Sequence, residues 1–159
     1  MEFSAENKKK VEEILTRYPN KRAALLPVLW IAQEQFGHLS NEVQAYVGQL
    51  LEVPPAHVYG VVTFYTMFHR KPVGRFYIQL CRTLSCALMG GDNLLQHIKE
   101  RLKVGENETT RDGMFSLCTV ECLASCGTGP ALMINEKYFE NVTPKKFDEI
   151  VTKLLEKSD

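Results

Sequence analysis

The sequence has no cysteine before Cys81, and all five of its cysteines lie between that residue and Cys126. No two of them form the C-x-x-C motif of dithiol oxidoreductases, which argues against that class of redox catalysis. Their odd number also argues against a framework of disulfides. Lysine and arginine together number 19, as do aspartate and glutamate, so the net charge is zero at pH 7. Bulk charge therefore gives no reason to expect nucleic acid or an anionic membrane as a partner.

Long apolar runs and targeting segments are missing as well. The longest apolar stretches, AALLPVLWIA and VYGVVTFYTMF, are much shorter than the roughly 20 residues that span a bilayer, so we expect no direct membrane insertion. The first residues, MEFSAENKKK, have neither the apolar centre of a secretory signal nor the composition of a transit peptide. We therefore expect the chain in the cytoplasm, a reducing compartment in which grouped cysteines favour metal or redox chemistry over disulfides.

What the sequence does contain is a composition typical of a folded globular protein, with 45% apolar and 24% charged residues. Its character changes near Lys71-Pro72-Val73-Gly74. The pattern before this point is helical, whereas short β-type runs alternate with helices after it. We therefore predict a helical bundle over residues 1–72 and a second domain over residues 73–159.

Four helices are predicted in the first domain, from apolar residues at helical spacing and from residues that begin or end helices. They are expected to begin after Ser4, near Arg22, after Ser40 and at Pro54-Pro55. Pro27 should kink the second helix or mark a late start, and Gly37 should end it. The fourth helix contains VYGVVTFYTMF and is apolar almost all round, so we expect it to be buried on several sides.

The second domain alternates strands and helices. Strands are predicted over 75–81, 113–121, 130–136 and 137–142, and helices over 92–102 and from Pro144 onward. Asp92 and Thr143 are the predicted N-caps of the two helices. A hairpin turn at Asn135-Glu136-Lys137 should join the last two strands. The predicted fold class is therefore α+β, a helical bundle followed by a small mixed sheet covered by helices.

Four of the cysteines fall in two loops at the ends of predicted strands. They are Cys81 and Cys86 in the first loop, and Cys122 and Cys126 in the second. Two loops at one end of a sheet can bring four thiolates to one centre. Gly127 and Gly129 allow the backbone to come close, and backbone N–H groups that donate to sulfur tune iron–sulfur clusters.

Several kinds of site compete for these thiols. A structural zinc site accepts four thiolates, although zinc sites favour C-x-x-C spacing. Cysteines with packing roles alone are common singly and unusual as four in paired loops. The four histidines, His38, His57, His69 and His97, lie outside both loops, so we expect no Rieske centre and treat them as surface or packing residues. The residues favour a [2Fe–2S] cluster and leave a zinc-stabilised, non-redox adaptor as the alternative of another class.

The cysteine pattern resembles that of a known family. C-x4-C, followed after about 35 residues by ECLASC and then Gly-x-Gly-Pro, is similar to the thioredoxin-like [2Fe–2S] ferredoxins. The stretches YPNKRAALLPVLWIAQEQFGHLS and VPPAHVYGVVTFYTMFHRKPVG narrow the resemblance to the E subunits of NADH-quinone oxidoreductases, the respiratory complex I. The resemblance extends from about Phe3 to Leu155.

The resemblance implies a thioredoxin-like second domain that holds one [2Fe–2S] cluster. Cys81, Cys86, Cys122 and Cys126 match the four cluster ligands of the family, and no residue is expected to act in catalysis. The cluster would exchange single electrons with the FMN of a larger, F-type subunit that oxidises NADH. The sequence has no G-x-G-x-x-G after a strand and no P-loop lysine, which agrees with FMN and NADH being bound by that partner.

The chain would thus be an electron carrier within an enzyme, placed at the periphery of the inner membrane by its complex. An equivalent subunit of a flavin-linked hydrogenase or formate dehydrogenase is the alternative within the redox class. Tyr65 on the helical bundle is a candidate to contact the partner, whereas Trp30 and Phe68 are expected to fill the core.

Three further residues carry expectations. Ala124 stands where the family often has glycine, and Arg82 where it often has a small hydroxyl residue. Arg82 should raise the reduction potential slightly if it lies near the cluster. Cys118 is predicted within a strand, whose geometry separates its Cα from that of Cys122 by roughly 13 Å. We therefore expect Cys118 to be a buried packing residue and not a ligand.

Overall fold

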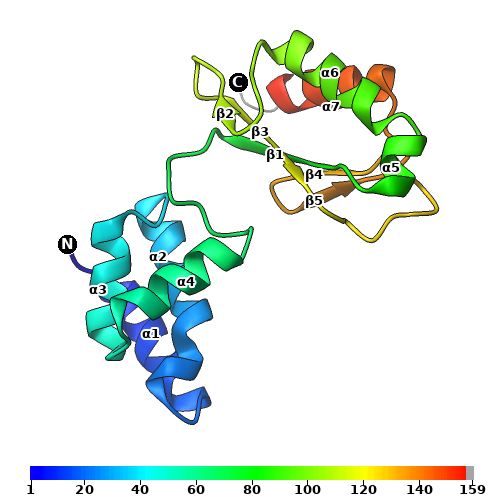
Figure 1. Cartoon of the computed structure of the whole chain (residues 1–159). Coiled ribbons are helices and arrows are strands. Elements are labelled where there is room, and N and C mark those ends of the chain that lie inside the picture. The colour runs from blue at the N-terminus through cyan, green and yellow to red at the C-terminus, as the bar shows by residue number, and fades with distance from the viewer. Residues whose placement is uncertain (157–159) are drawn as a thin grey trace. The chain divides into compact units, whose positions relative to one another are not determined.

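Figure 1 shows a computed structural model of the chain, which describes residues 1–156. The chain divides into two compact units, one ending at Pro72 and the other beginning at Val73. The first is helical, and the second combines helices with a five-stranded sheet. The predicted α+β fold class is confirmed. No helix within the described residues is both long enough and apolar enough to cross a membrane.

The first unit contains four helices and one short helical turn. They are α1 (Ala5–Arg17), the 3₁₀ turn η1 (Lys21–Ala24), α2 (Leu25–Phe36), α3 (Asn41–Leu51) and α4 (Pro55–Phe64). The side chains of Ser4 and Ser40 accept hydrogen bonds from the N–H groups three residues later, which caps α1 and α3 as predicted. Pro27 lies in the first turn of α2, so its predicted late start is confirmed. Gly37 ends α2 in a left-handed conformation.

The prediction that the fourth helix is buried on several sides is wrong. α4 buries only Val58 and Val62, whereas Tyr59 is 49% and Phe64 77% exposed. The helix packs mainly against α3 within its unit, so only one of its faces is covered. α4 ends at Phe64. Its apolar side chains on the other faces are exposed, so the helix has an apolar surface and not a central position in its unit.

Trp30 and Phe68, the two residues expected to fill the core of the first unit, both pack in it. Phe68 is buried, and Trp30 packs against it with 6.2 Å between the ring centroids. Tyr65 is exposed, and its contact with a partner chain stays a prediction.

The second unit contains five strands and three helices. They are β1 (Phe76–Cys81), α5 (Leu84–Leu88), α6 (Gly91–Leu102), β2 (Glu108–Thr109), β3 (Phe115–Val120), β4 (Leu132–Ile134), β5 (Lys137–Phe139) and α7 (Pro144–Glu156). The strand order is β2-β3-β1-β4-β5, with β1 and β3 parallel and the other neighbours antiparallel. α5 and β2 were not predicted, because so few residues carry no readable periodicity.

The two helix starts that were predicted in the second unit agree differently with the structure. Thr143 caps α7 as expected, since its hydroxyl accepts a hydrogen bond from the N–H of Lys146. The predicted cap at Asp92 is wrong: α6 begins at Gly91, its N-cap is Gly90 with a left-handed φ of 98°, and Asp92 lies in the first turn. An acidic residue there still interacts favourably with the positive end of the helix dipole.

The core of the second unit lies between the sheet and two helices, α6 and α7, which Figure 1 shows on the same side of the sheet. Ile78 and Leu80 of β1 point to this side, where they pack with Ile98 of α6 and Phe147 of α7. Because side chains alternate along a strand, Tyr77 points to the opposite face of the sheet. β1 and β3 run side by side in the middle of the sheet, and both end at the same edge.

Candidate iron–sulfur site

The parallel pairing of β1 with β3 brings the two cysteine loops together. Cys81, the last residue of β1, pairs in register with Val120, the last residue of β3. The chain therefore leaves both strands side by side, and the N–H of Arg82 donates to the carbonyl of Val120 at 3.0 Å. The Arg82 guanidinium also donates to the carboxylate of Glu121, at 3.1 Å from Nε to Oε1. Both loops begin at one edge of the sheet, next to each other.

The first loop is compact and buried. Cys81 and Cys86 are each only 2% exposed, and Cys86 lies on the short helix α5. The Thr83 hydroxyl is 3.2 Å from the sulfur of Cys81. Two glycines make room here: a Cβ on Gly91 would lie 2.7 Å from the carbonyl oxygen of Cys86, and one on Gly129 would lie 3.3 Å from its sulfur.

The two buried thiols differ in acidity. Burial opposes ionisation of Cys81, but hydrogen bonds from the Thr83 hydroxyl and from backbone N–H groups of Thr83 and Leu123 outweigh it and lower the pKa of this thiol. Burial raises the pKa of Cys86, and its hydrogen bond with Cys81 raises it further. Cys81 is therefore the thiol of this pair that is more readily converted to the thiolate that binds metal.

The second loop is exposed and irregular. Cys122 and Cys126 both lie on the surface, in a segment without helix or strand between β3 and β4. The N–H of Ala124 donates to the sulfur of Cys122 at 3.3 Å. Ala124 has a φ of 57°, a left-handed conformation that favours glycine. Cys126 lies close enough to Cys86 that a negative charge on its sulfur would raise the pKa of the Cys86 thiol.

The donor set fits a binuclear cluster. Among residues 1–156, no group of three or more cysteine, histidine, aspartate or glutamate side chains is gathered closely enough to hold a metal ion, and this includes the four predicted ligands. A [2Fe–2S] cluster has two irons, each of which takes two protein ligands, so its thiolates come in pairs. The chain offers two pairs on adjacent loops, with hydrogen-bond donors to Cys81 and Cys122 already in place.

The fifth cysteine lies within a strand. Cys118 is buried in β3, and burial raises the pKa of its thiol. The Tyr77 hydroxyl donates a hydrogen bond to its sulfur, and burial together with this bond raises the pKa of Tyr77. Cys118 therefore has a local partner and a packed environment, which supports the packing role predicted for it.

A set of side chains that holds the second loop was missed by the sequence analysis. Glu140, in the turn between β5 and α7, accepts hydrogen bonds from the hydroxyls of Ser125 and Thr128, each at 2.5 Å. The Tyr138 hydroxyl donates to the carbonyl of Leu123 in the same loop. No local sequence pattern predicts these hydrogen bonds, because they join residues that are 12 to 15 positions apart and the backbone between them is largely irregular.

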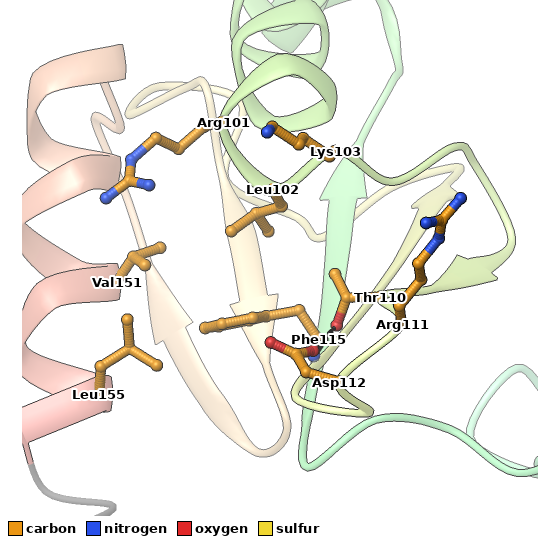
Figure 2. A pocket seen from close by; sticks show the side chains of 9 residues that line it. All are labelled: Arg101, Leu102, Lys103, Thr110, Arg111, Asp112, Phe115, Val151 and Leu155. Atoms are coloured by element: carbon orange, nitrogen blue, oxygen red, sulfur yellow. Dashed lines mark hydrogen bonds between the residues drawn. The ribbon is translucent and has the colours of Figure 1, made fainter.

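A hollow of about 570 Å³ elsewhere in the second unit contains no cysteine. Figure 2 shows the apolar side chains of Leu102, Phe115, Val151 and Leu155, with the basic side chains of Arg101, Lys103 and Arg111 around them. The nine lining residues are Arg101, Leu102, Lys103, Thr110, Arg111, Asp112, Phe115, Val151 and Leu155. Arg101 is paired with Asp148 at 3.3 Å, and Asp112 accepts a hydrogen bond from the N–H of Met114 at 2.9 Å. Arg101 thus links α6 to α7, and none of the predicted site residues lines the hollow.

The chain matches a family model over most of its length. The model described as thioredoxin-like [2Fe–2S] ferredoxin covers residues 11–155. The chain is 43% identical over 155 residues to the E subunit of the NADH-quinone oxidoreductase of Rickettsia bellii, an alignment that covers 96% of this chain and 93% of the relative. It is 41% identical over 144 residues to the E 2 subunit of the NADH-quinone oxidoreductase of Rhizobium meliloti, with 91% and 86% covered.

The fold also has a counterpart among solved structures. A chain of the NAD+-reducing [NiFe]-hydrogenase in its air-oxidized state superposes with a TM-score of 0.71 and 20% sequence identity. The match covers 84% of this chain and 23% of the hydrogenase chain, so this protein spans about a quarter of that chain's length. At this level of identity the likeness shows the fold alone.

Proposed function

Because the chain belongs to the thioredoxin-like [2Fe–2S] ferredoxin family, we propose that it carries electrons as a subunit of an NADH-quinone oxidoreductase. Subunits of that complex are its relatives at about 40% identity over nearly the full length of both chains. The observation that carries the proposal is the pair of cysteine loops that leave β1 and β3 side by side. The finer features below are part of the same proposal.

One [2Fe–2S] cluster is held by Cys81, Cys86, Cys122 and Cys126. The cluster, when bound, accepts and returns a single electron, which needs no general acid or base. The chain's own residues supply the ligands and the hydrogen bonds to their sulfurs, from Thr83 to Cys81 and from Ala124 to Cys122. Burial of the first pair excludes water from one side of the site. These features set the potential at which the electron is exchanged.

The electron comes from the FMN of an F-type partner subunit that binds and oxidises NADH. The partner docks over α5, where Leu84 and Leu88 are 75% and 79% exposed and Met89 is exposed beside them. This surface carries no charge and lies on the helix that contains Cys86. An apolar contact there would bring the partner close to the cysteine ligands and would exclude water from the contact. The complex places the chain in the cytoplasm, at the periphery of the inner membrane.

Chemical analysis of the purified chain tests the cofactor. We expect two irons and two inorganic sulfides per chain, red-brown colour with visible absorption, and an EPR signal after reduction with dithionite. Zinc without sulfide in a colourless protein would instead identify a non-redox adaptor.

Co-purification tests the partner. A tagged chain expressed in its own cells should bring down a subunit that contains FMN and oxidises NADH. Leu88→Lys should abolish that recovery, because it places a charge in an apolar contact, and should leave the visible spectrum unchanged. Recovery with hydrogenase or formate dehydrogenase subunits would assign the chain to a different complex.

A further inference from the structure

The exposed cysteine loop needs an anchor that its own backbone does not provide. Residues 121–131 contain no helix or strand, so no regular hydrogen-bond ladder holds Cys122 and Cys126. Ala124, midway between them, has a left-handed φ of 57°. That conformation is unfavourable for any residue with a Cβ, and the loop would relax to another conformation if nothing opposed it.

The Tyr138 hydroxyl holds the carbonyl of Leu123, and the N–H of Thr128 donates to the carbonyl of Ser125 at 3.1 Å. The side-chain contacts around Cys126 converge on one carboxylate. Oε1 of Glu140 is 2.5 Å from the hydroxyl oxygens of both Ser125 and Thr128, which lie on either side of Cys126 in the chain. Those two hydroxyls are also 2.5 Å from each other. Ser125 is only 7% exposed, so its hydroxyl depends on protein partners for its hydrogen bonds. Glu140 therefore holds both ends of the short segment that carries the Cys126 thiol.

Glu140 is itself held in place by hydrogen bonds to its own backbone carbonyl and from the backbone of the next residue. Its carbonyl accepts a hydrogen bond from the Lys146 side chain of α7 at 2.6 Å. The N–H of Asn141, the next residue, donates to the carbonyl of Thr128 at 2.6 Å. The Ser125 and Thr128 hydroxyls lower the pKa of the Glu140 carboxyl, which is therefore ionised at neutral pH. Hydrogen bonds to an ionised acceptor are stronger than those between neutral groups.

We propose that Glu140 is a positioning residue for the iron–sulfur site: its carboxylate binds the hydroxyls on both sides of Cys126 and so fixes that thiol in the position from which it binds iron. The inference rests on the proposed function, since it concerns the same site. It adds a residue outside both cysteine motifs, 14 positions beyond Cys126, and it assigns to this residue a role in keeping the cluster rather than in electron transfer itself.

Three single variants test the role, each prepared as the full chain with its cluster. Glu140→Ala removes the acceptor and should release iron to a chelator about tenfold faster than the wild type, with a changed EPR spectrum of the reduced cluster. Glu140→Gln keeps an acceptor oxygen without the charge and should release iron at an intermediate rate. Glu136→Ala is the matched control, because Glu136 is an exposed glutamate in the neighbouring β4–β5 turn. It should behave as the wild type.

A double variant separates positioning from general destabilisation. Ala124→Gly relieves the left-handed alanine, so Ala124→Gly with Glu140→Ala should release iron more slowly than Glu140→Ala alone. Thermal unfolding by far-UV circular dichroism shows whether each variant is folded. If Glu140→Ala does not fold, the Glu140→Gln variant decides the question through its iron release and EPR spectrum.

The possible outcomes distinguish this inference from the function on which it rests. A wild-type chain without iron and sulfide overturns both. A wild-type chain with its cluster, together with Glu140 variants that match Glu136→Ala in iron release and EPR spectrum, overturns the role of Glu140 alone. Failure of the Ala124→Gly substitution to slow iron release would equally refute it, since Glu140 would then not be opposing strain in the loop.

Discussion

The two cysteine loops are held in contrasting ways. In the first, Cys81 ends a central strand and Cys86 lies on a helix, so both are buried and positioned by regular backbone. In the second, Cys122 and Cys126 are exposed on irregular chain that contains a left-handed alanine. That loop is held by the side chains of Tyr138 and Glu140, which come from beyond it in the sequence.

The difference indicates where each half of the site is vulnerable. The first loop depends on close packing of backbone, so added volume should damage it. The second depends on a few hydrogen bonds and on one strained residue, so changes in those groups should alter it by smaller steps. One half of the site is therefore rigid by construction, and the other can be adjusted by single substitutions.

The largest effect is expected from removal of a ligand. Cys122→Ala should abolish the visible absorption of the purified chain, because one iron loses a thiolate. Cys81→Ala should do the same in the buried loop. Cys118→Ala is the matched control and should keep the spectrum, since this thiol bonds with Tyr77 within the sheet. Loss of the spectrum in Cys118→Ala, or its survival in Cys122→Ala, would overturn the ligand assignment.

The next effect concerns packing around the first loop. Gly91→Ala places a Cβ 2.7 Å from the carbonyl oxygen of Cys86, a backbone atom that cannot move without moving the cysteine. We expect the free energy of unfolding to fall by about 1–3 kcal/mol, measured by urea denaturation with far-UV circular dichroism.

Gly60→Ala serves as the control for that substitution. Gly60 lies within α4, and nothing is within 4 Å of the position of its Cβ. The same exchange should there raise stability by roughly 0.5–1 kcal/mol, because alanine favours the helix. Equal responses at the two glycines would show that the first loop is not tightly packed.

A substitution in the second loop is expected to have a smaller effect than Gly91→Ala and to raise the free energy of unfolding instead of lowering it. Ala124→Gly should stabilise the folded chain by about 1 kcal/mol, because glycine adopts a positive φ without the clash that alanine suffers. Ala87→Gly in α5 makes the same chemical change in a helix and should cost about 0.5–1 kcal/mol. Iron release to a chelator and urea denaturation measure both variants, and a loss of stability in Ala124→Gly would contradict the strain.

The smallest effect is expected from the charged pair at the mouth of the two loops. Arg82 and Glu121 bond to each other, and both side chains are largely exposed to water. Arg82→Gln should lower the reduction potential and Glu121→Gln should raise it, each by about 20 mV or less because solvent screens these charges. In a redox titration the double variant should return to the wild-type potential. An increase in Arg82→Gln would rule out the electrostatic effect.

Much of the fold could be predicted from the sequence, because its signals are local. Ser4, Ser40 and Thr143 cap helices through bonds to groups three residues away, and the strand that ends in Cys81 shows its β-type composition directly. The prediction failed where a neighbour decided the outcome. α4 is apolar all round but is buried on one side only. The burial of a helix depends on how many elements pack around it, which its composition does not reveal.

The candidate site divides in the same way. The sequence predicted four ligands and a [2Fe–2S] cluster from the spacing of Cys81, Cys86, Cys122 and Cys126 and from the resemblance to the family. This was possible because the residue type and the spacing of the thiols are read directly from the sequence. The residues that hold the loops were not predictable. Glu140 is a glutamate like others on the surface until the chain folds and brings Ser125 and Thr128 to its carboxylate.

The sequence alone determined the α+β class, most of the helix boundaries and the set of thiols, because each of these depends on residues close together in the chain. Only the tertiary structure decided that the two loops leave parallel strands side by side and that one pair of thiols is buried while the other is exposed. It also decided that a distant carboxylate holds the exposed loop. These features depend on the register between strands and on side chains far apart in sequence, which meet only after the chain has folded.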